Sequence, residues 1–159
     1  MASTALRTYV ARSGSSATNT TGVSLSAATA KSVVAVLGAS SDTIGLCRVK
    51  VSFSSATSTD APAIVEVGVI TAIGTVTSFT PVQNSGPSQA SSASAGYNAT
   101  VEPTYTRVID PFYVPVFNGT YAEWFPLGFE PVVAASQGFA VRVTSPAAVT
   151  CLASILFAE

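Results

Sequence analysis

The chain has 159 residues, of which 9% are charged and 48% are hydrophobic, and its seven Lys and Arg nearly balance its eight Asp and Glu. This balance excludes a protein that binds nucleic acid through a strongly basic field, and the hydrophobic content excludes disorder driven by charge. The sequence contains no His, so mechanisms that need a catalytic or metal-binding imidazole are excluded too. The length corresponds to one domain.

The first 22 residues differ in composition from the rest of the chain. Residues 13–22 consist of Ser, Thr, Asn, Ala and Gly, which is typical of a flexible joint. Before this joint, Leu6, Tyr9 and Val10 are the apolar residues that could anchor the segment. We therefore expect residues 1–22 to form an extended N-terminal arm, with these three side chains buried against a neighbouring subunit. The alternative is a first strand that folds back onto its own domain.

Alternation of apolar and polar residues predicts short strands through the remaining sequence, residues 23–159, which we expect to form a single domain. The clearest strand covers residues 44–53, with Arg48 and Lys50 on the face opposite Val49 and Val51. Residues 63–70 are apolar on both faces except at Glu66, as in a central strand. Residues 149–157 have apolar residues on both faces and predict an interior strand. Other strands are expected at residues 23–27, 31–39, 75–82, 101–109, 112–117 and 139–144.

Two connecting segments are also predicted. Residues 84–96 are rich in Ser, Ala and Gly and indicate a long exposed loop. The Asn118-Gly119 dipeptide predicts a turn of the kind found in hairpins.

Eight to ten short strands without a helix predict an all-β protein. We expect an antiparallel, jelly-roll-like β-sandwich with about eight main strands in two four-stranded sheets. An immunoglobulin-like sandwich is the alternative, but Trp124 lies only 27 residues before Cys151, which does not fit the Cys, Trp and Cys order of that fold.

The residues that could carry chemistry are few, and we predict no catalytic, cofactor or metal site. Cys47 and Cys151 are interpreted as buried small hydrophobic residues, and a disulfide between them is left open. Glu66 could be a general acid, but we interpret it as facing a solvated seam or an interface. Arg48 and Lys50 are interpreted as the solvated face of a strand. The tyrosines spaced by eight residues are interpreted as core or interface aromatics: Tyr97, Tyr105, Tyr113 and Tyr121.

The sequence shows no targeting or membrane-spanning segment. The longest apolar run, residues 33–37, is far shorter than the ~20 residues that span a bilayer. Met1–Arg12 lacks the apolar stretch of a signal peptide. We expect a soluble protein made in a cytosol.

The last third of the chain resembles small structural proteins of tailed-bacteriophage virions. The resemblance rests on residues 124–128 (WFPLG), 137–142 (QGFAVR), 145–150 (SPAAVT) and 155–159 (ILFAE). The composition, poor in charge and rich in Ser, Thr and Ala, is similar to that of capsid decoration (cement) proteins. The resemblance covers about forty residues and assigns no role to an individual residue.

What the resemblance implies is a non-enzymatic virion protein that binds the outside of a capsid as a decoration subunit. Its partners would be the lattice of the major capsid protein, to which the N-terminal arm could also bind, and further copies of itself, with a trimer favoured. It would bind neither nucleic acid nor membrane and need no cofactor, and it would be made in the host cytoplasm. The alternative is a receptor- or glycan-binding head, in which Trp124, Tyr121 and Phe125 form a stacking platform near Asn118-Gly119.

Overall fold

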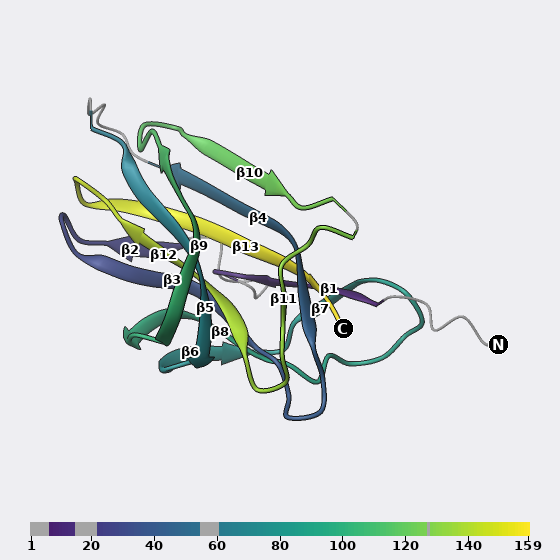
Figure 1. Cartoon of the computed structure of the whole chain (residues 1–159). Helices are drawn as coiled ribbons and strands as arrows, with labels where there is room; N and C mark the ends of the chain where they lie inside the picture. The colour runs from purple at the N-terminus through teal and green to yellow at the C-terminus, as the bar shows by residue number, and fades with distance from the viewer. Residues whose placement is uncertain (1–6, 15–21, 55–60, 127) are drawn as a thin grey trace.

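The computed structural model describes residues 7–14, 22–54, 61–126 and 128–159. Within these ranges the chain contains no helix, and its strands form two antiparallel sheets that pack face to face (Figure 1). The predicted β-sandwich is therefore confirmed. The strands are β1 (Thr8–Arg12), β2 (Val23–Leu25), β3 (Ala30–Leu37), β4 (Ile44–Ser54), β5 (Ala63–Ala72), β6 (Thr75–Phe79), β7 (Val82–Ser85), β8 (Ser94–Val101), β9 (Thr104–Val114), β10 (Thr120–Trp124), β11 (Val132–Val133), β12 (Gly138–Thr144) and β13 (Val149–Ala158).

The strands divide into sheets of seven and six. The seven-stranded sheet has the order β10-β4-β13-β1-β7, with β11 beside β4 and β2 beside β13. The six-stranded sheet has the order β6-β8-β3-β12-β5-β9. The described ranges thus hold thirteen strands in place of the eight main strands expected, in sheets of seven and six rather than four and four. The additional strands are mainly segments for which the sequence predicted no strand, namely β1, β8, β10 and β11. A jelly-roll connectivity stays a prediction.

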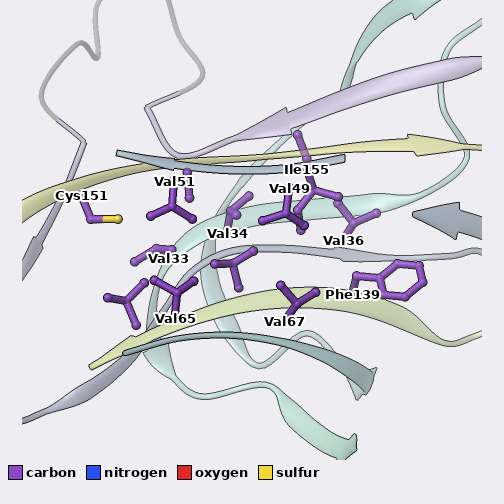
Figure 2. Packing of buried hydrophobic residues seen from close by; sticks show 14 of the residues in the cluster. Val33, Val34, Val36, Val49, Val51, Val65, Val67, Phe139, Cys151 and Ile155 are labelled. Carbon is purple, nitrogen blue, oxygen red and sulfur yellow. The ribbon is translucent and has the colours of Figure 1, made fainter. Parts of the chain in front are cut away.

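The hydrophobic core lies between the two sheets. Its centre is built largely from valines of β3, β4 and β5, whose branched side chains pack well on pleated sheets (Figure 2). Phe139 of β12 and Ile155 of β13 fill the space beside them. As predicted, β13 is an interior strand, because it pairs with both β4 and β1.

The two cysteines are free thiols. Cys151 points into the core (Figure 2), where burial raises the pKa of its thiol to about 12. Cys47 is half-buried, and burial, followed by the nearby Glu130 carboxylate, raises the pKa of its thiol. The register places Cys151 opposite Phe53 rather than Cys47, so no disulfide joins them. The interpretation as a buried residue is correct for Cys151 and only partly so for Cys47.

The prediction of an N-terminal arm is wrong for Thr8–Arg12, because this segment is strand β1 of the protein's own sandwich. β1 pairs with β13 on one side and with β7 on the other. Tyr9 is completely buried, its ring stacks on Phe157 with 5.7 Å between centroids, and its hydroxyl donates to the Gln89 carbonyl oxygen at 3.2 Å. The alternation that buries Tyr9 and Ala11 is that of a half-buried strand. The domain therefore includes residues assigned to the arm, and Leu6 lies outside the described residues.

The two predicted connections are each only partly correct. Asn118 has a φ of 51°, and a Cβ on Gly119 would lie 1.7 Å from the Pro115 carbonyl oxygen, so the turn forms. It is not a hairpin, however, because it leads from β9 in one sheet to β10 in the other. The predicted loop at residues 84–96 is shortened at both ends by β7 and β8. Its last part is held by the Glu159 carboxylate, which accepts from the Ser91 hydroxyl and the Ala93 amide.

A long two-stranded ribbon shapes the six-stranded sheet. Residues 63–79 (β5 and β6) pair with residues 95–114 (β8 and β9) in one antiparallel run. β5 lies beside β12 and β8 lies beside β3, while β3 and β12 pair with each other. The ribbon must therefore bend across the outer face of β3 and β12, which brings the β8–β9 connection over that face.

Candidate functional site

A polar network lies where the ribbon crosses the outer face of the six-stranded sheet. The Ser32 amide of β3 donates to both carboxylate oxygens of Glu102 (3.0 and 3.1 Å), and the Ser32 hydroxyl lies 2.7 Å from the Tyr105 hydroxyl. On the next strand, Arg142 donates from Nε to Glu66 at 2.8 Å and lies over the Tyr105 ring, 4.6 Å from its centroid. The network therefore joins β3, β5, β9, β12 and the β8–β9 connection.

The structure gives Glu66 a partner that the sequence did not predict. Glu66 is ion-paired with Arg142, which lies directly opposite it on β12, and both side chains are partly exposed. Burial, partly offset by the hydrogen bond with Ser32, raises the pKa of Tyr105 to about 12, so its phenol is neutral near pH 7. Because these charged and polar groups bind one another, we interpret the network as structural.

Tyr105 is expected to titrate near pH 12 rather than near pH 10. The difference in absorbance at 295 nm between the wild type and Tyr105→Phe, recorded against pH, measures this ionisation. Because the folded state raises this pKa, its contribution to stability is complete below pH 10 and is lost as pH rises through 12. A difference titration with its midpoint at pH 10 would contradict the buried, hydrogen-bonded environment.

The outer face of the seven-stranded sheet carries a different arrangement, a row of side chains that crosses five strands. The register sets Trp124 opposite Arg48, Arg48 opposite Leu156, Leu156 opposite Val10, and Val10 opposite Val82. Directly opposed residues share one face of a sheet. We call these five residues the apolar row, and at ~4.8 Å per strand spacing it spans roughly 19 Å. The row takes one residue from each of the strands β10, β4, β13, β1 and β7.

The apolar row is centred on Leu156, which belongs to neither core cluster although it is 93% buried by its neighbours (7% exposed). Trp124, at one end, is 60% exposed, and Val82, at the other end, is 46% exposed. The Arg48 guanidinium lies 4.8 Å from the centroid of the Trp124 ring, a cation–π contact. The row thus combines an aliphatic centre with a tryptophan and an arginine, and these last two residue types are enriched among the residues that contribute most to binding at protein interfaces.

A second row beside the first is basic. Lys50 lies between Ala122 and Ser154, and Arg12 lies on the other side of Ser154. We call these four residues the basic row. Together with Arg48 they place three of the chain's seven Lys and Arg on one face. None of the three forms an ion pair with any residue in the described ranges. The ion pair found in these ranges joins Arg142 and Glu66, on the other sheet.

The residues singled out from the sequence lie in different places. Tyr9 is in the core, whereas Val10 is in the apolar row, so the predicted interface group is divided between two faces. Arg48 and Lys50 do share the outer face, as the alternation predicted, but the apolar row beside them was missed. Its members come from five separated segments, and only the strand order brings them together. Trp124 is exposed, while the Tyr121 ring packs against the Phe112 ring in a tilted arrangement with 4.3 Å between centroids, so the predicted platform does not form as a group.

Other kinds of site were also considered. In the part of the chain that the structure describes, no three His, Cys, Asp or Glu side chains gather as metal ligands would. The same residues include no helix of the length and hydrophobicity needed to cross a membrane. Comparison with protein-family models, with curated proteins and with solved structures gave no match.

Proposed function

We propose that the protein is a non-enzymatic structural protein of a virion, which binds the outside of a phage capsid as a decoration subunit. The observation that carries the proposal is the outer face of the seven-stranded sheet, where the apolar row is exposed at both ends next to cations that form no ion pair with the residues that the structure describes. Such a face suits binding to another protein surface. The resemblance of residues 124–159 to virion proteins supports the assignment of that surface to a capsid.

Many copies on a symmetric shell would bind through avidity even if each contact is weak. Further copies of the chain, in a trimer, are part of this proposal. The sandwich supplies a rigid body for such contacts, since the sheets are fully paired through their centres.

The proposal predicts that the protein co-purifies with intact virus particles from its source. The number of copies per particle, measured by quantitative mass spectrometry, should match a set of symmetry-equivalent positions on the shell. Particles without the protein should release their contents at a lower temperature than complete particles. Absence of the protein from purified particles, or unchanged thermal resistance after its removal, would contradict the decoration role.

A receptor- or glycan-binding head is the second candidate, because Trp124 is 60% exposed and could stack on a sugar ring. A glycan array probed with the wild type and with Trp124→Ala separates the two candidates. Glycan binding that Trp124→Ala abolishes would favour the head, and an array without binding would remove it.

A further inference from the structure

We infer that the outer face of the seven-stranded sheet is the docking surface for an acidic protein partner, whose carboxylates surround an apolar centre. This inference rests on the proposed function, and it adds which face binds and what the partner's surface must carry. The apolar row supplies the centre of the contact, and Lys50 and Arg12 of the basic row supply charge beside it.

The charge of the outer face indicates whether its partner is acidic or is a second copy of this chain. Arg48, Lys50 and Arg12 have no ion-pair partner in the described residues, and Glu130, which lies beside Gly45, is an acidic residue at the border of this face. The face therefore carries an excess of positive charge. A two-fold contact between two copies uses the same patch of both. A second copy bound through this face would therefore place its cations next to those of the first, and they would repel one another. A partner with carboxylates gains attraction instead, together with faster association.

The distribution of apolar groups favours a protein over a polysaccharide. Beyond the aromatic end of the row, Leu156 is already buried, and the apolar surface open to a partner comes from the half-buried Val10 and from Val82, which is 46% exposed. A sugar ring stacks on an aromatic but gains little from an aliphatic ridge, whereas a protein surface buries such a ridge against its own apolar side chains. The Arg48 guanidinium already covers part of the Trp124 ring, which leaves less of the ring for a sugar.

The first experiment uses a defined probe, a dye-labelled peptide of twelve residues that alternates Glu and Leu, with a Lys-Leu peptide of equal length as control. Anisotropy should show binding of the Glu-Leu peptide alone. Trp124 is the single tryptophan, so its emission should also shift to the blue as the face is covered. Lys50→Glu with Arg12→Glu, and separately Trp124→Ala, should each weaken binding roughly 10- to 100-fold.

Matched control variants lie on the other sheet. Arg107 and Tyr113 of β9 are exposed, Tyr113 at 70%, so Arg107→Glu and Tyr113→Ala remove the same kinds of group from a different face. These controls should bind the Glu-Leu peptide as the wild type does. Equal binding of both peptides, an equal loss in the controls, or tighter binding of a sulfated oligosaccharide than of the Glu-Leu peptide would overturn the inference.

The second experiment separates this inference from the proposed function. Purified particles stripped of the protein are mixed with the wild type, the face variants and the β9 controls, and the bound protein is measured after sedimentation. Binding by the wild type and the controls, with loss in the face variants, supports both proposals. Equal binding by all variants keeps the decoration role and overturns the docking face. Selective binding of the Glu-Leu peptide without binding to particles keeps the face and overturns the capsid as its partner.

Discussion

A variant that lacks residues 2–13 is expected to lose the cooperative unfolding transition of the wild type, or to melt at least ~10 °C lower. The deletion removes β1, which pairs with β13 and β7, and it removes Tyr9 and Ala11 from the core. Loss of a buried aromatic alone costs about 3–5 kcal/mol, and each kcal/mol lowers the melting temperature by roughly 2–4 °C in a domain of this size. Circular dichroism during heating measures the change.

Point variants at Tyr9 show how the loss arises. Tyr9→Ala should cost about 3–5 kcal/mol, because it leaves a cavity beside Phe157. Tyr9→Phe keeps the ring and loses the hydrogen bond to the Gln89 carbonyl oxygen, so it should cost about 1 kcal/mol. If the truncated protein melted at the wild-type temperature, residues 8–12 would behave as a detachable arm after all.

The elements that the sequence predicted best are those whose local pattern also decides their packing. The strands β4 and β13 are eleven and ten residues long and alternate over most of that length, at residues 48–54 and 149–155, and the alternation directs Val49 and Ile155 to the core and Lys50 to solvent. At β5, apolar residues on both faces predicted a central strand correctly, because β5 lies between β12 and β9. In these segments, the pattern of apolar residues that predicts a strand also determines which side chains are buried.

The N-terminal strand could not be recognised in this way. β1 has five residues, and two of them, Tyr9 and Ala11, point inward. Next to a joint of small polar residues, so short a pattern does not differ from an arm with a few apolar anchors. The segment is a strand because its backbone pairs with β13 on one side and with β7 on the other. The residues with which it pairs lie more than seventy positions away in the sequence.

The candidate docking face illustrates the same limit. Alternation alone placed Arg48 and Lys50 on an outward face. Their cross-strand neighbours Trp124, Leu156 and Val10 depend on strand order and register, which arise from the whole fold. A local bulge lies directly beside this pair, because the register of β4 against β13 shifts between Leu156 and Phe157, and this shift sets Phe157 opposite Leu46 rather than Cys47.

The replacement Gly68→Ala is expected to destabilise the protein by about 3 kcal/mol, although alanine is only one methyl group larger. A Cβ at Gly68 would lie 2.5 Å from the Tyr105 ring, far inside van der Waals contact. The ring cannot move away without cost, because its hydroxyl bonds Ser32 and its face contacts Arg142. Overpacking of this kind costs 1–3 kcal/mol or more. Urea unfolding at equal m-value measures the loss.

Gly45→Ala is the matched control, because Gly45 is also a strand glycine but its Cβ would meet Glu130 at 3.4 Å, an ordinary contact. It should change the stability by less than about 1 kcal/mol. The double variant Gly68→Ala with Tyr105→Ala tests the cause, since removal of the ring also removes the clash. The two changes together should therefore cost at least ~1 kcal/mol less than the sum of their separate costs. Strict additivity would mean that the Tyr105 ring is not what a Cβ at Gly68 clashes with.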